Sequence, residues 1–497
     1  MAIAKVCGTE TEYGIVLRGV AESNPIAASS ALINAYAQQM QRRVGWDFED
    51  EAPGRDARGY AREGTVAPEV ETNLVNTVLT NGGRYYVDHA HPEYSTPECA
   101  TPRELVLYDK AGEMILAESM RAAARTLPDG QGIVVYKNNS DGKGNSYGCH
   151  ENYLVDRAVP FGRLAEHLIP YFVTRQVFTG AGKVGTEVPF APARGVPYQI
   201  SQRADFFEEE IGLETTLKRP IINTRDEPHA DAQRYRRLHV IVGDANLAEV
   251  STFLKVGVTS VVLAMIEDDW IAGLNVAIAA PVAAMRAVSW DVGLGHRLEL
   301  AEGGNATALQ IQWQYLEAAR KYAEARGLEC IGPDGAGLEV LDRWEATLTA
   351  LESDPMSLSA QLDWVAKYQL LDAYRERHQI AWDDPRLAAM DLQYHDVRPE
   401  KSLFARLPME RLLEDDAVNT ATEEPPRDTR AYFRGRCLQR WGSSIAAANW
   451  DSLVFDLGGD PLRRVPMMEP LRGTAAHVDK LLEGCSGPAE LLERLGS

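Results

Sequence analysis

An unusual run of ionisable side chains, RYYVDHAHPEYSTPE, occupies residues Arg84–Glu98. Side chains two residues apart point to the same face of a strand, so Arg84, Tyr86 and Asp88 are expected to share one face. That face either binds a charged ligand or is the solvated outer face of an antiparallel sheet. Pro92 is expected to end regular strand pairing soon afterwards, because proline has no backbone N–H to donate.

Three further segments repeat this pattern of polar groups at strand spacing: GTETEYGI, KNNSDGKGNSYGCHENY and YRRLHVIVGDAN. The pairs that share a face are Glu10 with Glu12, His150 with Asn152, and Arg237 with His239. In the last segment, Leu238 and Val240 form an apolar opposite face, which is typical of a strand that packs on a core. Several such strands side by side would line one polar site.

The residue types indicate a metal–nucleotide site on a sheet. Carboxylate oxygens are the ligands that magnesium prefers, and arginines bind phosphate in a bidentate way. A glycine-rich turn such as SDGKGNSYG can bring backbone donors close to phosphates, although it does not match the GxxxxGK[ST] pattern of a P-loop. Histidine is more often structural and is a less typical magnesium ligand, so manganese and zinc remain open at this level.

The chain changes character near residue 245, from strand-like segments to helical ones. CGTETEYGIVL, GRYYVD, GIVVYKNN and RRLHVIVGD read as strands, whereas Ala308–Arg326, Leu358–Arg375 and Lys480–Leu495 have apolar residues at helical spacing. This order predicts an α+β fold. The most apolar stretch, Val256–Ile266, is too short to span a bilayer and is predicted to be part of a buried helix.

The composition bounds the possible functions. The 497 residues include 72 Asp and Glu against 51 Lys and Arg, a net charge of -21, which argues against binding to nucleic acid or to an anionic membrane. The six cysteines include no CxxC pair, which favours a reducing, cytoplasmic location, and the N-terminus does not resemble a signal peptide. Residues 47–73 are polar and acidic and are expected to form a mobile insertion. The run EEPPRDTR reads as a linker that separates a domain of residues 1–425 from a small C-terminal domain of residues 426–497.

Six motifs, taken together and in order, resemble the family of Pup deamidases and Pup ligases, which is related to glutamine synthetase. Pup is the prokaryotic ubiquitin-like protein. The motifs are GTETEYG, RYYVDHAHPEYSTPE, YKNNSDGKGNSYGCHENY, TLKRPIINTRDEPHAD, RRLHVIVGDANLAE and DTRAYFRG with NWDSLVFDLGG. The resemblance implies a glutamine-synthetase-like antiparallel sheet that forms a cradle backed by helices, plus a small C-terminal domain. It also implies ATP (or ADP plus phosphate) and magnesium at one end of the cradle, with the Pup C-terminus entering from the other.

The resemblance assigns roles by matching position. Asp88 matches the catalytic aspartate of the family. The positions that match metal-site residues are Glu10, Tyr86, Glu93, His150 and His239. The positions that match nucleotide contacts are Glu10, Thr11, Glu12, Tyr13, Gly14, Ser95, Thr96, Asn152, Arg237 and, through the ligase, Trp450. The positions expected near the transferred phosphate or the substrate carboxylate are Arg203, Arg225 and, on the same strand as Asp88, Arg84.

Two features favour the hydrolase branch of this family. The motif DHAHPE has one residue fewer between its Asp and its Pro-Glu than the ligase has, and the acidic insertion resembles a loop that marks the hydrolase. The implied enzyme deamidates the C-terminal glutamine of Pup and cleaves the Pup–lysine isopeptide bond, with Asp88 as nucleophile or general base. Its partners would be Pup and pupylated proteins, and it would act as a monomer. The alternatives are an ATP-consuming Pup–protein ligase, another carboxylate–amine ligase of this fold, and a catalytically silent adaptor that binds Pup.

Overall fold

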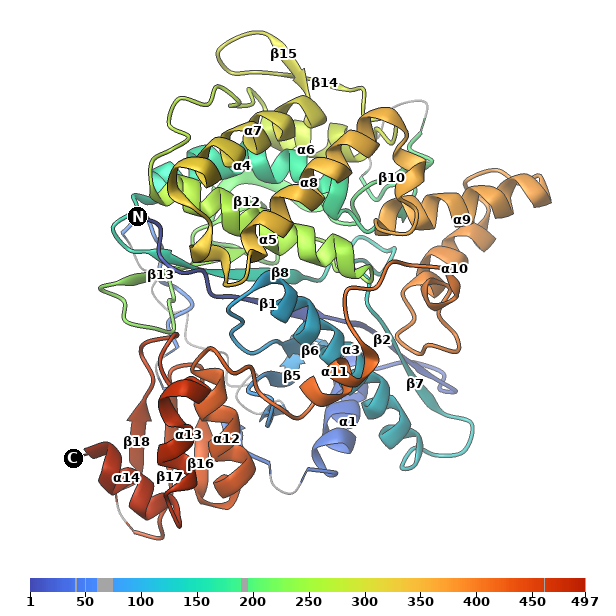
Figure 1. Ribbon diagram of the computed structural model, residues 1–497. Helices are drawn as coiled ribbons and strands as arrows, with labels where there is room; N and C mark the ends of the chain where they lie inside the picture. The colour runs from blue at the N-terminus through green and yellow to red at the C-terminus, as the bar shows by residue number, and fades with distance from the viewer. Residues whose placement is uncertain (41–42, 50, 60–74, 189–194, 460, 497) are drawn as a thin grey trace.

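The centre of the protein is a six-stranded antiparallel sheet. We analysed a computed structural model, which describes residues 1–40, 43–49, 51–59, 75–188, 195–459 and 461–496 (Figure 1). The strands of the sheet, in spatial order, are β13 (Tyr235–Val240), β8 (Cys149–Asp156), β1 (Cys7–Glu12), β6 (His91–Ser95), β5 (Arg84–Asp88) and β4 (Asn76–Val78). Each neighbouring pair is antiparallel, as the sequence predicted.

The sheet has one apolar face and one polar face because its strands alternate. In β1, Thr9 and Thr11 are buried on the helix side, whereas Glu10 and Glu12 point to the other side. Strand β8 repeats this alternation, and its buried Glu151 is neutralised by Arg175 at 2.5 Å. The ionisable side chains predicted to share faces therefore do share one face of the sheet.

Three helices cover the apolar face: α1 (Pro25–Ala37), α3 (Pro102–Ala124) and α5 (Glu249–Glu267). Helix α3 begins where Thr101 accepts a hydrogen bond from the Glu104 N–H and proline occupies the first turn. Gly112 of α3 lies against the Tyr94 ring, where a Cβ atom would come within 2.3 Å of the ring, so only glycine allows this close packing. By length and hydropathy α5 could span a bilayer, but it is entirely buried in the molecule, and the prediction of a buried helix there is confirmed.

A second group of helices packs on α5 and forms most of the hydrophobic core. These helices are α4 (Phe161–Thr179), α6 (Pro281–Ser289), α7 (Ala308–Arg326) and α8 (Ala336–Ser353). The remaining helices of the large domain are α9 (Asp363–His378), α10 (Pro385–Tyr394) and α11 (Asp415–Ala421), and α9 and α10 project from its side (Figure 1). The α+β class, with an antiparallel sheet backed by helices, is thus confirmed.

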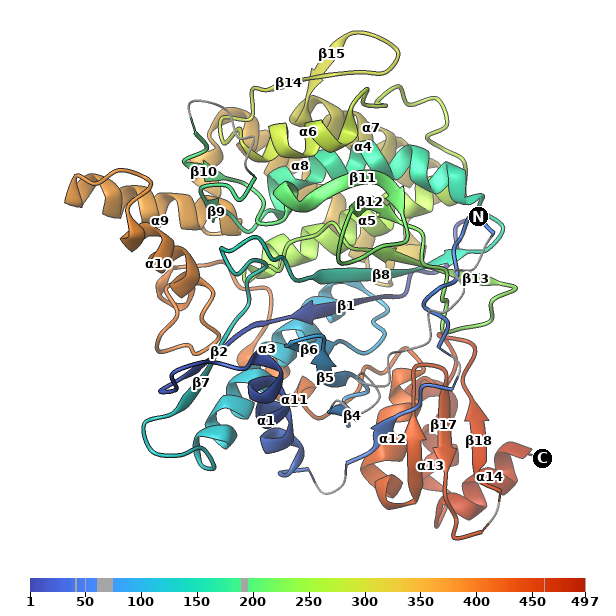
Figure 2. The ribbon, with the colours of Figure 1, turned by 180° about the vertical axis from the view of Figure 1, so that it is seen from behind.

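In the described part of the chain, four small two-stranded sheets lie outside the large one. They are β2 (Gly14–Arg18) with β7 (Gly132–Tyr136), β9 (Lys183–Val184) with β10 (Tyr198–Gln199), β11 (Phe207–Gly212) with β12 (Arg219–Asn223), and β14 (Arg297–Glu299) with β15 (Asn305–Thr307). The β11–β12 pair is parallel. Figure 2 shows β8 and β1 crossing the middle of the molecule, between the helices around α4 and the C-terminal part of the chain.

The C-terminal part of the chain forms a small unit with its own core. Its helices are α12 (Ala431–Trp441), α13 (Ala475–Glu483) and α14 (Pro488–Gly496), and its sheet has the order β18 (Arg463–Pro466), β17 (Ser452–Phe455), β16 (Ile445–Ala448) and β3 (Gly45–Trp46). Strand β3 comes from the N-terminal part of the chain and pairs with β16 in parallel. The unit is fastened to the large domain by Arg430 and Arg434, which both form ion pairs with Glu98.

Several local predictions were wrong. Pro92 does not end pairing but lies within β6, opposite Val87 of β5; the chain reverses earlier, at His89, whose φ of 50° is left-handed. A proline is tolerated there because it stands at the start of a strand, and its carbonyl still accepts from the Tyr13 N–H at 3.0 Å. The helix predicted over 480–495 is two helices, broken by the sequence Gly-Cys-Ser-Gly. The helix predicted over 358–375 starts only at Asp363, after a short 3-10 turn.

The acidic segment 47–73 is partly described. Residues 60–74 lie outside the described residues, but 51–59 form hydrogen bonds to the loop after β12. The Ala57 N–H donates to the Thr224 carbonyl at 2.8 Å, and Thr224 donates to Asp56 at 2.7 Å. The first part of the expected mobile insertion is therefore anchored to the large domain.

Candidate active site

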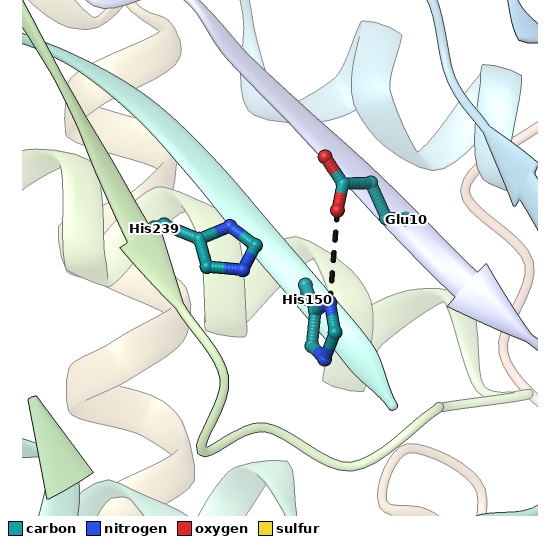
Figure 3. A group of neighbouring side chains, drawn as sticks. All are labelled: Glu10, His150 and His239. Carbon is teal, nitrogen blue, oxygen red and sulfur yellow. Dashed lines mark ion pairs between the residues drawn. The ribbon is translucent and has the colours of Figure 1, made fainter. Parts of the chain in front are cut away.

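Two groups of ligand-type side chains lie side by side on the polar face of the sheet. The first, called here the histidine cluster, consists of Glu10 of β1, His150 of β8 and His239 of β13 (Figure 3). Each residue offers one ligand atom, and these atoms all lie within 4.8 Å of one another. Glu10 and His150 are direct cross-strand partners, and their side chains are 3.6 Å apart.

Neighbouring polar groups orient the histidine cluster. Asn152 donates to Glu10 at 3.0 Å, and its carbonyl oxygen accepts from Arg237 at 2.8 Å and lies 3.1 Å from His239 Nδ1. His239 Nδ1 thus lies between this acceptor and the Arg237 guanidinium, which can only donate, at 3.3 Å. His239 Nε2 is buried and has no hydrogen-bond partner among the described residues.

Charge in this cluster is well balanced. Burial alone would raise the pKa of Glu10, but its hydrogen bond to His150 and the charge of Arg237 hold that pKa well below its usual value. Burial, with the charge of Arg237, lowers the pKa of His239 well below its usual value. The cluster therefore presents a carboxylate and a neutral imidazole, the forms that bind metal ions.

The second group, called here the carboxylate cluster, consists of Glu12 of β1, Asp88 of β5 and Glu93 of β6. Tyr86 donates a hydrogen bond of 2.5 Å to Glu93, its cross-strand neighbour. Burial and the charges of Asp88, Glu12 and Glu10 raise the pKa of Glu93 well above its usual value. Three carboxylates this close repel one another unless a cation or a proton lies among them.

The members of the carboxylate cluster differ in exposure. Glu93 is 2% exposed and the Glu12 side chain 11%, whereas the Asp88 side chain is 32% exposed. Burial would raise the pKa of Glu12, but hydrogen bonding to His91 and the charge of His150 lower it to about 2. Asp88 contacts His89 at 3.0 Å. Asp88 is thus the carboxylate that a substrate entering from solvent reaches first.

Both clusters have the donors that a divalent cation requires. The oxygen-rich carboxylate cluster suits magnesium, and the unpartnered Nε2 of His239 completes a carboxylate–imidazole set. Gly148 keeps the space between the clusters open, because a Cβ atom there would lie 2.3 Å from His150 Nε2 and 2.9 Å from Glu12 Oε1. The residues present therefore fit the implied cations.

A cavity opens next to the histidine cluster, between the sheet and the C-terminal unit. Its apolar wall includes Val6, Leu154 and Trp450. The predicted site residues that line it are Glu10, Ser95, Thr96, Asn152, Arg237 and Trp450. A flat apolar wall with charged groups at one end suits a purine nucleotide.

The other predicted contacts in the stretch from Glu10 to Gly14 lie elsewhere. Thr11 faces the helix side, where its hydroxyl contacts the Cys149 thiol, and Tyr13 is completely buried in the core beneath the sheet. Gly14 lies against Tyr147, 2.5 Å from where its Cβ would be. Thr11 and Tyr13 alternate with Glu10 and Glu12 and therefore face away from the polar side, whereas Gly14 lies past the end of β1, so these three residues do not line the cavity.

The predicted arginines occupy three different environments. Arg84 is stacked between two rings, Trp46 at 3.9 Å and Tyr86 at 3.8 Å. Arg203 is buried beside Ser146, and burial together with the charge of Arg219 lowers its pKa to about 10. Arg225 lies close enough to the histidine cluster for its charge to lower the pKa of His239. The Nε atom of Arg225 has no hydrogen-bond partner among the described residues.

Sequence reasoning missed Arg219, at the start of β12. Its guanidinium donates to the Ser146 carbonyl at 2.7 Å, and its charge acts on Glu12 of the carboxylate cluster. Together with Arg203 it forms a positive border beside that cluster. The motif TLKRPIINTRDEPHAD contains this arginine, but nothing in its local pattern distinguishes it from Arg225.

The glycine-rich turn does not offer its donors to a phosphate. The N–H groups of Lys143 and Asn145 donate to Asp141, and the Gly144 N–H donates to Glu187 at 2.7 Å. The turn is thus closed by carboxylates, and its role is to place His150 and Asn152 at the start of β8.

A comparison with known proteins matches residues 5–454 to the family described as Pup-ligase protein. The chain belongs to this family. It is 56% identical to the depupylase of Acidothermus cellulolyticus and 48% identical to the Pup deamidase/depupylase of Mycobacterium tuberculosis, each over 99% of both chains. It is 43% identical to the Pup–protein ligase of Xylanimonas cellulosilytica over 82% of this chain and 90% of the ligase.

Solved structures of the ligase PafA show the same fold. The complex of Pup with PafA superposes with a TM-score of 0.80 at 34% identity, covering 99% of this chain and 94% of the other. PafA in complex with ADP superposes with a TM-score of 0.74 at 38% identity, covering 84% and 92%. The depupylase and the Pup deamidase/depupylase share higher identity with this chain than the ligases do, which agrees with the branch that the DHAHPE spacing predicted.

Proposed function

We propose that this protein is a Pup deamidase and depupylase. It hydrolyses the side-chain amide of the C-terminal glutamine of Pup, and it cleaves the isopeptide bond between Pup and a lysine of a pupylated protein. Its full-length identity of 56% to a depupylase carries this proposal. An accessible carboxylate, Asp88, at the edge of a cluster of carboxylates supplies the matching chemistry.

We assign the nucleotide, ATP or ADP with phosphate, to the cavity beneath Trp450. The relative solved with ADP and the apolar wall of this cavity support that assignment. Glu10, His150 and His239 would hold magnesium at the nucleotide phosphates, and Glu93 with Glu12 would hold it at the reaction centre. A divalent cation at either place supplies positive charge that stabilises the oxyanion developing on the attacked carbonyl.

The side chains of the carboxylate cluster and its border carry the remaining catalytic roles. Asp88 either attacks the amide carbon or takes a proton from a water that attacks it. In the first case the C–N bond breaks, the nitrogen takes up a proton and leaves as ammonia or as the lysine amine, and water then hydrolyses the resulting anhydride. In the second case the same amine leaves directly as the proton taken by Asp88 is passed to it. Tyr86 fixes the Glu93 carboxylate, while Arg203 and Arg219 border the cluster where a substrate carboxylate would bind. Amide hydrolysis in water is downhill, so the nucleotide completes the site without being consumed.

The decisive experiment incubates the protein with Pup ending in glutamine, with magnesium and ATP. We expect a one-dalton mass increase of Pup and no stoichiometric release of ADP. Mass-neutral Pup, together with ADP release when Pup ending in glutamate and a lysine substrate are supplied, would identify a ligase instead. Binding of Pup with neither reaction would identify an adaptor. Size-exclusion chromatography tests the monomeric state that we propose, and the six cysteines, all free thiols, agree with a cytoplasmic location.

A further inference from the structure

A continuous stack of side chains connects the nucleotide cavity to the carboxylate cluster. Trp450 lines the cavity, and its ring packs edge-on against Trp46 with centroids 5.1 Å apart. The Arg84 guanidinium then lies between the rings of Trp46 and Tyr86, at 3.9 Å and 3.8 Å. Tyr86 in turn donates to Glu93 at 2.5 Å. The contacts therefore run continuously from Trp450 to Glu93.

The stack crosses three separate parts of the chain. Trp450 follows β16 in the C-terminal unit, and Trp46 lies in β3, whose backbone pairs with β16. Arg84 begins β5 of the central sheet and is fixed from the side by Asn76, which accepts from its Nε at 3.0 Å. The Trp46 indole donates to Glu51 at 2.7 Å, in the first part of the acidic segment. The stack therefore links the C-terminal unit and the acidic segment to a strand that carries Asp88.

The contacts are of a kind that fixes orientation. A planar guanidinium between two aromatic faces gains attraction on both sides and keeps its charge at any working pH. Removing the Arg84 guanidinium would leave the Tyr86 ring free to turn. The hydrogen bond from Tyr86 that orients the Glu93 carboxylate would then weaken. Because Glu93 is 2% exposed among other carboxylates, a small displacement there changes the whole cluster.

We propose that Arg84 is a positioning residue that couples the nucleotide cavity to the carboxylate cluster by holding Trp46 and Tyr86 in one stack. It acts through Tyr86 on Glu93 and does not contact the substrate. The consequence for turnover rests on the hydrolase activity proposed above, whereas the consequence for nucleotide binding rests only on the assignment of the nucleotide to this cavity. This role replaces the substrate or phosphate contact that the sequence predicted for Arg84.

The first test measures ADP affinity in the presence of magnesium by calorimetry, which needs no Pup. We expect Arg84→Met to weaken ADP binding about tenfold and Arg84→Lys about threefold, because lysine keeps the charge but not the planar stacking. A matched control is Arg427→Met, which removes a guanidinium 5.4 Å from the Tyr432 ring on the outside of the C-terminal unit and should leave the affinity unchanged. ADP affinities of both Arg84 variants within twofold of the wild type would overturn the coupling.

The second test is a double-mutant cycle on Pup deamidation. In the wild-type background, we expect Arg84→Met to lower kcat about tenfold and to leave the KM for Pup unchanged. In the Tyr86→Phe background, Arg84→Met should change kcat less than twofold, because the hydrogen bond to Glu93 is already lost. Independent, additive effects, or a rise in KM with kcat unchanged, would show that Arg84 is a substrate contact instead. If Arg84→Met does not fold, Arg84→Lys enters the same cycle with an expected threefold loss. If the wild type binds ADP but does not process Pup, the proposed function fails while the calorimetric test still decides the coupling.

Discussion

The two ligand clusters share strand β1 but balance their charges in different ways. In the histidine cluster, a hydrogen bond to His150 and the charge of Arg237 hold the pKa of Glu10 well below the usual value, although burial acts in the opposite direction. In the carboxylate cluster, burial and three neighbouring acids raise the pKa of Glu93 well above the usual value. The first cluster is stable as it stands, whereas the second requires an added cation to keep all of its members ionised. This contrast supports the proposal that the first cluster binds the nucleotide and the second carries the chemistry.

The largest effect is expected from a substitution of Asp88, the most exposed member of the carboxylate cluster. Asp88→Asn keeps the size of the side chain but removes its charge and its nucleophile, and we expect deamidation and depupylation to fall by at least about a thousandfold. Binding of Pup should persist, because affinity for a long extended partner is spread over many contacts. A mass-based deamidation assay and an anisotropy titration with labelled Pup measure the two quantities.

The matched control is Glu210→Gln, which removes an exposed carboxylate on β11 and should leave turnover unchanged. Near-normal turnover of Asp88→Asn would remove its catalytic role. Loss of Pup binding along with turnover would make Asp88 a substrate-positioning residue.

The second prediction concerns Glu98, which lines the cavity beside the histidine cluster. Glu98 forms ion pairs with Arg430 and Arg434 of the C-terminal unit. Burial would raise the pKa of Glu98, but the charges of Arg434 and Arg430 lower it to about 2. Glu98→Gln leaves two buried guanidinium groups poorly paired, and we expect it to lower the free energy of unfolding by about 3 kcal/mol at pH 7. Denaturant unfolding followed by tryptophan fluorescence measures this loss.

The pH dependence of that loss follows from the sign of the shift. A lowered pKa in the folded state stabilises the protein above the unfolded pKa of about 4.5, and this stability disappears as the pH falls towards 2. The difference between wild type and Glu98→Gln should therefore shrink over that range. Glu490→Gln, which removes an equally lowered pKa from an exposed ion pair, should have little effect on unfolding at pH 7. A difference that stays constant down to pH 2 would contradict the assignment.

A third prediction separates the two clusters directly. Glu10→Gln should weaken ADP–magnesium binding about a hundredfold, while Glu93→Gln should reduce kcat by a similar factor with a smaller effect on ADP affinity. Calorimetry measures the ADP affinity of each variant, and the deamidation assay measures the kcat of each variant. Equal changes in both readouts for both variants would show that the clusters act as a single site.

The smallest expected effect concerns the apolar wall of the cavity. Trp450→Ala removes a ring that can stack on a base, and we expect ADP affinity to fall about twentyfold with kcat at saturating nucleotide nearly unchanged. Trp313→Ala, which truncates a partly buried indole on α7, serves as the control for ADP affinity. An unchanged ADP affinity of Trp450→Ala would place the base elsewhere.

The sequence by itself determined which residues face the same way. Strand alternation placed Glu10 with Glu12, His150 with Asn152, and Arg237 with His239, and all six lie on the polar face of the sheet. The buried helix around Val256–Ile266 and the helix Ala308–Arg326 also followed from local periodicity. The six motifs, through their resemblance to a family, identified the relatives as well. These features are local, so a short stretch of sequence is enough to specify them.

Only the tertiary structure decided which faces meet. The order of the strands brings Asp88 close to Glu12, and the bridge between Val44 and Val78 of β4 brings Trp46 against Arg84 of β5, which is distant in sequence. The same long-range packing closed the glycine-rich turn with Glu187 and placed Arg219 beside Glu12. Such contacts depend on register and on the docking of distant segments, and these are set by the burial of the core as a whole and not by any local pattern.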